Sequence, residues 1–197
     1  MASIDQRIAD FWKWFSEHSA EFAAVTIGQE LLSQLENRLF AIDRVDWEIG
    51  PGRRSACLFS LSPRGDPERL KLTRKIIGQA PQLHGWEFSP AKLERAWNLV
   101  FQISVNGKNI DVDGKLWEFV AYKFKDGRFD LDFRPDEASS LPQNEAHLAA
   151  TIIIDGELGE ERRMALVGDV GIVDSWDENV SRSARRLEVG LLAKVIA

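Results

Sequence analysis

The stretch CLFSLSPRGDPERLKLTRKIIGQAPQLHGWEFS, residues 57–89, predicts a β-α-β unit. Residues 56–61 are apolar on both alternating faces, which is typical of a strand inside a sheet rather than at its edge. After a helix, residues 84–88 resume an extended run. If the two strands lie parallel in one sheet, the connection between them should be right-handed. We therefore expect the remainder of the fold to be arranged around a central strand at residues 56–61.

The helix of this unit has sequence signals at both ends. Asp66 has a side chain suited to the N-cap, and Pro67 suits the first helical position because its φ angle is fixed. Gly78 and Pro81 mark the end of the helix. Apolar and small residues recur on one face at 3- and 4-residue spacing: Leu70, Thr73, Ile76, Ile77 and Ala80. This face should pack on the sheet, with Ile76 and Phe59 as neighbours in one core.

Two helices are predicted before the sheet. The first has an apolar stripe made of Ile4, Ile8, Phe11, Phe15 and Phe22. The second begins with a capping box at residues 26–29 and buries Leu31, Leu32, Leu35, Leu39 and Ile42. Trp12 and Trp14 flank the first stripe. A broad aromatic face usually belongs to a core, since each ring can bury about 150–250 Å². The alternative is that Trp12 and Trp14 form a surface for a protein partner.

Residues 45–49 predict a half-buried strand, because Val45, Trp47 and Ile49 alternate with acidic residues. The turn at residues 50–52, Gly-Pro-Gly, makes this strand the expected antiparallel neighbour of the central strand. A glycine-rich turn can also hold a phosphate group, but no Lys-Ser or Lys-Thr pair follows this one and no helix begins there. The sequence therefore argues against a phosphate loop.

Three dipeptides favoured in two-residue hairpin turns predict a four-stranded meander at residues 99–105, 108–112, 116–125 and 128–133. These dipeptides are Asn106-Gly107, Asp113-Gly114 and Asp126-Gly127. The first turn pairs Ile103 with Ile110 and Phe101 with Val112. The third pairs Phe124 with Phe129, Tyr122 with Leu131 and Lys123 with Asp130.

The middle turn of the meander should differ from the other two. A strict two-residue turn at Asp113-Gly114 would place the apolar residues of the two hairpins on opposite faces, so we expect an extra residue there. With that residue added, Trp117 and Phe119 lie on the face opposite the core. These two rings would need cover from a helix or from a partner.

The C-terminal third predicts two helices and a strand. A helix should run from Pro142 to Asp155, with Gly156 beyond its C-cap. Residues 166–173 predict a strand that is kinked at Gly168, and residues 181–196 predict a final amphipathic helix. A short helix is also expected at residues 92–97.

Together these patterns predict an α+β fold with two N-terminal helices, a mixed or antiparallel sheet containing one β-α-β unit and a β-meander, and C-terminal helices. The 197 residues fit a single domain, 1–197, for which two lobes at 1–97 and 98–197 are the alternative.

No apolar run is long enough for a membrane span, and the net charge of −6 argues against nucleic acid as a partner. The single cysteine, Cys57, cannot form an internal disulfide, so we expect a cytoplasmic location.

The residues with metal-binding or catalytic chemistry form few candidate sites, and we predict no cofactor. The histidines at 18, 84 and 147 lie too far apart for a zinc motif. The clearest acidic segment is DGELGEE, whose carboxylates are Asp155, Glu157, Glu160 and Glu161. Paired carboxylates can hold a metal ion or act as acid and base, although a helix end followed by a glycine turn is commonly charged because it is exposed.

Several short motifs resemble those of a family of uncharacterised bacterial cytoplasmic proteins, a domain of unknown function. The motifs are Phe11-Trp12-Lys13-Trp14-Phe15, Ile49-Gly50-Pro51-Gly52, Gly65-Asp66-Pro67, Ala80-Pro81 with Gly85-Trp86, and the DGELGEE segment at 155–161. The resemblance implies an α+β fold, and it implies no activity, cofactor or catalytic residue.

Three functional hypotheses follow. The leading one is a non-catalytic protein-interaction module of the immunity or adaptor type, with a protein partner or a second copy as its ligand. It is favoured by the acidity and by seven tryptophans in 197 residues, because aromatic anchors dominate many interfaces. The second is a metal-assisted hydrolase that uses residues 155–161. The third is a small-ligand-binding protein whose pocket is lined by Trp86, Trp97 or Trp117.

Overall fold

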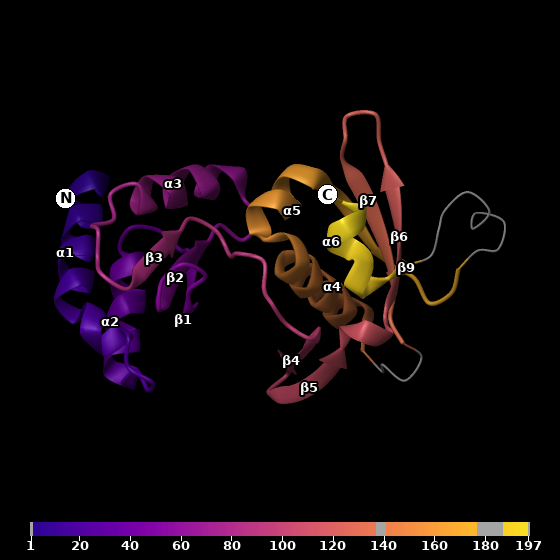
Figure 1. Cartoon of the computed structure of the whole chain (residues 1–197), viewed down its shortest axis with the longest axis horizontal. Coiled ribbons are helices and arrows are strands. Elements are labelled where there is room, and N and C mark those ends of the chain that lie inside the picture. Colours follow the sequence, from indigo (N-terminus) through magenta and orange to yellow (C-terminus); the bar gives the residue numbers. More distant parts are fainter. Residues whose placement is uncertain (1, 137–140, 177–186, 197) are drawn as a thin grey trace. The chain divides into compact units, whose positions relative to one another are not determined.

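The computed structural model describes residues 2–136, 141–176 and 187–196 (Figure 1). The chain divides into two compact units, Met1–Lys92 and Leu93–Ala197. Helices and mixed sheets are both present, so the predicted α+β class is confirmed, together with its two N-terminal helices and its β-α-β unit. Among the described residues, no helix combines the length and the apolar run that a membrane span requires.

The first unit contains a three-stranded sheet of order β1-β2-β3 and three helices. Strand β2 is central, as predicted: it pairs antiparallel with β1 and parallel with β3. The elements in chain order are α1 (Ile4–Phe22), α2 (Gln29–Phe40), β1 (Asp46–Pro51), β2 (Cys57–Ser62), α3 (Pro67–Ile77) and β3 (Trp86–Ser89).

The beginnings of α3 and α2 show one confirmed prediction and one wrong one. Asp66 is the N-cap of α3, and its carboxylate accepts hydrogen bonds from the backbone N–H groups of Glu68 at 2.8 Å and Arg69 at 3.3 Å. By contrast, α2 begins after Gly28 without a side-chain cap. The capping box at residues 26–29 is therefore wrong, because Thr26 lies two positions before the residue that takes the N-cap.

The core of the first unit is built on aromatic rings from α1. Phe15 of α1 lies 5.1 Å from Phe59 of β2, measured between ring centroids. Phe59 and Ile76 are both fully buried in this core, as predicted. Trp12 donates a hydrogen bond from Nε1 to the carbonyl oxygen of Ile76 at 2.7 Å, which joins α1 to the end of α3.

The described residues of the second unit form two sheets: a two-stranded sheet β4-β5 and a four-stranded sheet of order β8-β7-β6-β9. Its buried core combines residues of both sheets with residues of α4. The elements are β4 (Val100–Val105), β5 (Lys108–Asp113), the 3₁₀ turn η1 (Gly114–Leu116), β6 (Glu118–Lys123), β7 (Phe129–Arg134), α4 (Gln143–Leu158), α5 (Glu160–Leu166), β8 (Val167–Ile172), β9 (Leu187–Glu188), η2 (Val189–Leu191) and α6 (Leu192–Val195).

The four strands expected between residues 99 and 133 all form, but they are divided between the two sheets rather than joined in one meander. The chain leaves the β4-β5 sheet at η1. There, Gly114 donates its N–H to the carbonyl oxygen of Leu99 at 2.9 Å. A Cβ atom at Gly114 would lie 3.0 Å from Cδ1 of Ile153 in α4. The prediction that the middle connection is not a two-residue turn is thus confirmed. Packing of this turn on α4 directs β6 into the other sheet.

The two hairpin registers differ in outcome. The turn at Asn106-Gly107 pairs Ile103 with Ile110, as predicted. The pairing predicted for Asp126-Gly127 is wrong, because Tyr122 pairs with Asp130 and not with Leu131.

The cause lies in the length of that loop. Phe124 donates its N–H to Arg128 O at 2.8 Å, while Gly127, at φ +86°, donates to Phe124 O at 3.1 Å. This is a three-residue loop with glycine in the left-handed region, one residue longer than expected. The extra residue moves Phe119 onto the same face as Phe133 and hence into the core.

The C-terminal third departs from the predictions in several places. Helix α4 continues to Leu158 and ends at Gly159 (φ +78°) instead of Asp155, and α5, which was not expected, follows it. The kinked strand at 166–173 is confirmed as β8, which pairs with β7 through a bulge. The helix expected at 181–196 lies partly outside the described residues; within them, 187–188 form strand β9 and only Leu192–Val195 are α-helical.

Residues 92–97 do not form the short helix that was expected. Arg95 donates its N–H to the carbonyl oxygen of Gly156 at 2.7 Å, and the Trp97 side chain packs against the same glycine. The segment from residue 95 to residue 97 is therefore held without regular secondary structure by its contacts with the end of α4.

Candidate functional site

The aromatic residues proposed as an interaction surface are part of the two cores. Trp12 and Trp14 are 3% and 6% exposed in the first unit, and Trp117 and Phe119 are 1% and 0% exposed in the second. The stripe of α1 is wide enough to bury the flanking tryptophans, and the shifted register of β6 places Phe119 under α4. The expected surface at these four residues is therefore absent.

The acidic segment is also tied into the fold. Asp155 forms an ion pair with Arg163, and the buried Glu160 has Oε1 3.9 Å from Nη2 of the same arginine. Glu157 accepts a hydrogen bond from Nε1 of Trp97 at 3.0 Å. In the part of the chain that the structure describes, no three His, Cys, Asp or Glu side chains are grouped as metal ligands would be. The arrangement joins α4 to α5 and to Trp97, while Glu161 lies on the first turn of α5.

The three tryptophans proposed to line a pocket are divided between two cores. Trp86 packs in the core of the first unit, whereas Trp97 and Trp117 belong to the core of the second. Trp97 packs on Phe101, with ring centroids 5.5 Å apart.

A different region forms the best candidate site, where the end of α2 meets β1. It is a hollow of about 430 Å³, which we call the Phe40 cleft. It is lined by Glu36, Phe40, Asp43, Arg44, Val45, Asp46, Trp47, Arg64 and Lys92.

Phe40 is exposed because of its position on α2. The buried face of this helix is formed by Leu31, Leu35 and Leu39. Phe40 follows Leu39 directly, so its side chain is rotated by about 100° from that face. It is 56% exposed, and the guanidinium carbon of Arg44 lies 5.0 Å from the centroid of its ring. That distance is within the range of a cation–π contact. The sequence signal for this site is Phe40 itself, an apolar residue outside the apolar stripe of α2. The 3- and 4-residue spacing that predicts the buried face does not include it.

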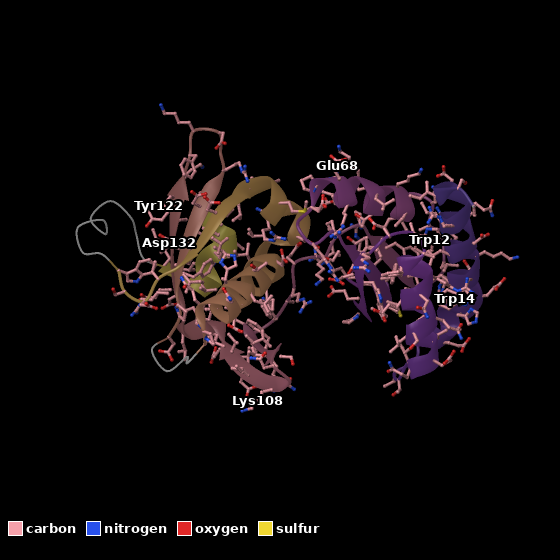
Figure 2. All side chains as sticks on the ribbon, turned by 180° about the vertical axis from the view of Figure 1, so that it is seen from behind. Trp12, Trp14, Glu68, Lys108, Tyr122 and Asp132 are labelled. Carbon is pink, nitrogen blue, oxygen red and sulfur yellow. The ribbon has the colours of Figure 1, made fainter. Side chains whose placement is uncertain are left out.

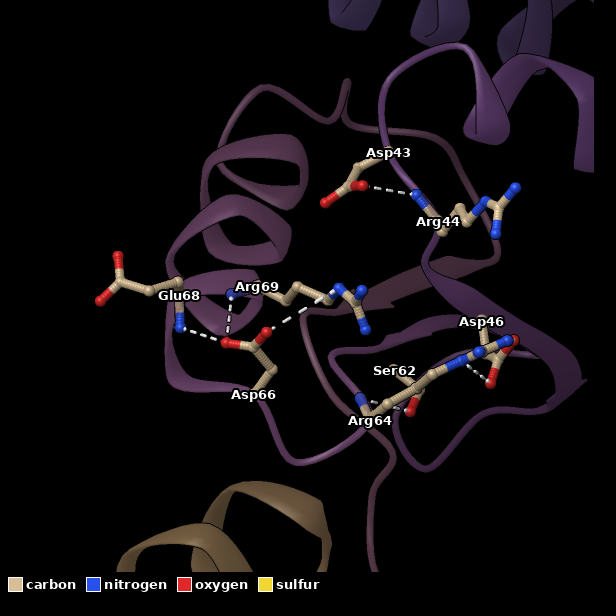
Figure 3. A network of polar contacts seen from close by, with 8 residues as sticks. All are labelled: Asp43, Arg44, Asp46, Ser62, Arg64, Asp66, Glu68 and Arg69. Atoms are coloured by element: carbon tan, nitrogen blue, oxygen red, sulfur yellow. Dashed lines mark hydrogen bonds and ion pairs between the residues drawn. The ribbon is translucent and has the colours of Figure 1, made fainter.

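Two further lining residues of the cleft, Arg64 and Asp46, form an ion pair (Figure 3). Arg64 donates from Nε to Asp46 Oδ2 at 2.6 Å and forms a second contact to the other carboxylate oxygen. Hydrogen bonding to this carboxylate, together with its negative charge, raises the pKa of Arg64 above its usual value. The backbone N–H of Arg64 is bonded to Ser62 Oγ at 3.2 Å. Paired, planar contacts of this kind fix the geometry of the guanidinium group.

Two charged groups of the cleft remain available to a ligand. Within the described residues, the Arg44 guanidinium has Phe40 as its contact and forms no ion pair, and the Glu36 carboxylate forms none either. Asp43 uses Oδ1 to accept the backbone N–H of Arg44 at 2.7 Å, which fixes the loop that carries the arginine. The cleft therefore presents an exposed ring, an unpaired cation and an unpaired carboxylate beside the Arg64–Asp46 ion pair.

A second hollow of about 450 Å³ lies where α1 ends and α2 begins. It is lined by His18, Glu21, Ala24, Thr26, Gly28, Glu30, Leu31 and Gln34. Nδ1 of His18 is 2.9 Å from the carbonyl oxygen of Trp14, and Gln34 donates to Glu30 at 3.1 Å. Several of its polar groups are thus already bonded within the protein, and it carries no exposed aromatic ring.

Comparison of the chain with protein families, with curated proteins and with solved structures finds no match.

Proposed function

We propose that this protein is a non-catalytic protein-interaction module of the immunity or adaptor type and that it binds its partner through the Phe40 cleft. The observation that supports the proposal is the exposed Phe40 ring, stacked with Arg44 beside the half-buried Trp47. Aromatic residues and arginine are enriched at the centres of protein interfaces, where a few side chains supply most of the binding energy.

The energetics of Phe40 fit this role. A phenylalanine that passes from exposed to buried contributes about 1.5–3 kcal/mol. In the free protein this side chain is more than half exposed, so most of that free energy is released only when a partner covers it. The Arg64–Asp46 pair restrains two side chains that line the cleft, which lowers the conformational cost of binding.

A bacterial origin and a cytoplasmic location belong to the same proposal. They are supported by the short motifs that resemble the bacterial family and by a single cysteine with no internal partner. An adaptor or immunity protein in that compartment would meet its partner in a reducing environment.

Site-specific photo-crosslinking tests the proposal. A photoreactive phenylalanine analogue replaces Phe40 in one sample and Phe124 in a matched control, because the two rings are similarly exposed, at 56% and 50%. We expect position 40 to give one defined protein adduct in cells of the native host, lost when Arg44→Ala is added. No adduct at position 40, or the same adducts at both positions, would contradict the assignment.

A small-ligand-binding function is the second candidate for the same cleft, because about 430 Å³ lies within the size range of ligand pockets. A thermal-shift screen against a metabolite library distinguishes the two. A ligand that stabilises the wild type and fails to stabilise Trp47→Ala would favour this second function.

A further inference from the structure

We propose that two copies of this chain associate by pairing their β4 strands antiparallel, which joins two β4-β5 ribbons into one four-stranded sheet. The proposal concerns the second unit and is independent of the Phe40 cleft. It is based on an open strand edge, on the side chains along that edge and on the register that a two-fold axis allows.

The outer edge of β4 has unused backbone groups. In a ribbon closed by a two-residue turn, Val105 with Lys108, Ile103 with Ile110 and Phe101 with Val112 are the hydrogen-bonded pairs. Gln102 and Ser104 therefore direct their backbone N–H and C=O groups away from β5.

Among the residues that the structure describes, no strand pairs with this edge and no hydrogen bond satisfies those groups. Both residues are exposed. The N–H of Val100 is the exception, since it donates to Asn98 Oδ1 at 3.2 Å.

The composition of β4 does not protect its edge. Its sequence, VFQISV, contains no charge, no proline and no glycine. Charged side chains, prolines and bulges are the usual means by which proteins prevent edge strands from pairing with another chain. The neighbouring β5 carries Lys108, Asp111 and Asp113, and the Lys108 side chain lies at the tip of the ribbon (Figure 2). The contrast shows that one edge of the ribbon is protected by charge and the other is not.

The geometry favours a second copy as the occupant of this edge. When two β4 strands are related by a two-fold axis, the residues whose backbone N–H and C=O groups point away from β5 must pair with each other. The register with the largest overlap places Gln102 opposite Gln102 of the second copy and Val100 opposite Ser104 of the second copy.

The side chains are compatible in that register. Each Gln102 already donates one amide N–H to Asp111 Oδ1 of its own ribbon at 2.7 Å, and its second N–H and its Oε1 can bond to Gln102 of the second copy. Phe101 faces Ile103 of the second copy, an aromatic–β-branched pair that stabilises antiparallel strands. The β5 edge is less suitable, because pairing it with itself would bring aspartates of two copies close together.

Sedimentation velocity over a wide concentration range tests the proposal, with two proline variants as a matched pair. Ser104 and Asn109 are opposite each other in the ribbon, and each directs its N–H outward, one on the β4 edge and one on the β5 edge. Proline is tolerated where a strand N–H points to solvent, so both variants should keep the ribbon. Circular dichroism and a melting curve check this.

We expect a reversible dimer for the wild type and for Asn109→Pro. Ser104→Pro should raise the dissociation constant at least about tenfold, the equivalent of one lost hydrogen bond or more. A wild type that is monomeric at every concentration would overturn the proposal. So would a loss of the dimer in both variants, or in neither.

Cysteine cross-linking provides a second measurement. In a Cys57→Ser background, the introduced thiol is the sole one in the chain. In an antiparallel sheet, a hydrogen-bonded pair has Cα atoms about 5.5 Å apart, which suits a disulfide. Gln102→Cys should therefore form a disulfide-linked dimer under mild oxidation, whereas Asn109→Cys should stay unlinked. The reverse pattern would place the interface on β5 and overturn the proposal.

Discussion

The indole ring of Trp97 lies directly against the backbone of Gly156 in α4, so that a Cβ atom at this glycine would come within 2.3 Å of Trp97 Cζ2. Trp97 also donates to Glu157, the next residue of the helix, at 3.0 Å. The glycine is thus required by a close approach between a side chain and a helix, because any larger residue would displace the ring. This contact explains why the segment before Trp97 is not helical, and it gives Glu157 a structural role as a hydrogen-bond acceptor.

We expect Gly156→Ala to destabilise the fold by about 1–3 kcal/mol, the range for overpacking a filled site. Gly190→Ala is the matched control in the same unit, since its Cβ atom would lie 3.8 Å from its nearest neighbour. Urea denaturation followed by far-ultraviolet circular dichroism measures both. In a Trp97→Ala background the penalty at Gly156 should disappear, and a penalty that persisted there would show that Trp97 is not its cause.

Because Trp12 is buried and Phe40 is exposed, replacing each by alanine should have very different effects on the free energy of unfolding. Trp12→Ala should destabilise the protein by about 3–5 kcal/mol, because it empties a core position and removes the shorter of two hydrogen bonds to the carbonyl of Ile76, whose other donor is the backbone N–H of Gln79. Phe40→Ala should change the free energy of unfolding by less than about 0.5 kcal/mol, as is usual for surface positions. If the denaturation curves showed the two variants to be equally stable, the assignment of Trp12 to the core would be wrong.

Asp66 should contribute measurably through the cap of α3. Asp66→Ala removes the acceptor for two backbone N–H groups and should cost about 0.5–2 kcal/mol. Glu68→Ala is the control, since it removes an exposed carboxylate that pairs with Lys71 at 2.6 Å and should cost at most about 0.5 kcal/mol. Thermal and urea unfolding measure the stability of the two variants. An equal loss of unfolding free energy in both would show that the cap contributes nothing beyond the surface ion pair.

Arg163 should be important for the stability of the acidic segment. Arg163→Ala leaves Asp155 and the buried Glu160 without this guanidinium group and should destabilise the protein by about 1–3 kcal/mol. Arg162→Ala, at the exposed neighbouring position, should be close to neutral. The urea concentrations at the unfolding midpoints of Arg163→Ala and Arg162→Ala measure this difference. If the two midpoints are equal, the prediction is wrong.

The same guanidinium bears on the hydrolase hypothesis. A cation already lies between the carboxylates of Asp155 and Glu160, and it would repel a second one. We therefore expect magnesium, manganese or zinc to leave the melting temperature of the wild type unchanged. Calorimetric binding of one of these ions, lost in a Glu160→Ala and Glu161→Ala double variant, would support the metal-dependent alternative instead.

Tyr122 should titrate above the usual range for tyrosine. Burial raises the pKa of its hydroxyl, and so do the negative charge of Asp132 and the hydrogen bond between the two side chains (Figure 2). Because the folded pKa is above the unfolded one, the protonated hydroxyl stabilises the fold fully below about pH 10, and this contribution is lost as the pH rises through the folded pKa.

Absorbance at the tyrosinate band measures this titration without overlap, because Tyr122 is the single tyrosine in the chain. Asp132→Asn should lower the midpoint, and unfolding in guanidinium should return it to about 10. A folded midpoint at or below the denatured one would contradict the contact with Asp132.

The parts of the fold that depend on neighbouring residues were predictable. Asp66-Pro67 begins a helix because its side chain and fixed φ angle act within one turn, and Asn106-Gly107 closes a two-residue turn because both residues accept positive φ. The glycine at 127 uses the same conformational freedom in a longer loop. The dipeptide alone does not distinguish the two, so the register of β6 with β7 was missed.

The candidate site was less predictable than the fold. For Trp12 and Trp14 the sequence favoured a core position but left a binding surface as the alternative, because the width of the buried stripe on α1 depends on how much sheet and helix lies opposite it. Phe40 was overlooked for the converse reason: it sits next to a buried leucine in sequence, and only the packing of α2 places its ring in solvent.

By itself, the amino-acid sequence determined the α+β class, the central strand β2 and the beginning of α3, since each follows from the periodicity of side chains or from a turn of a few residues. The tertiary structure decided which sheet each strand joins, which tryptophans are buried and where the Phe40 cleft forms. Those features depend on contacts such as Trp97 with Gly156 and Arg64 with Asp46, between residues 59 and 18 positions apart. Their energies depend on distances in space that no local pattern of side chains encodes.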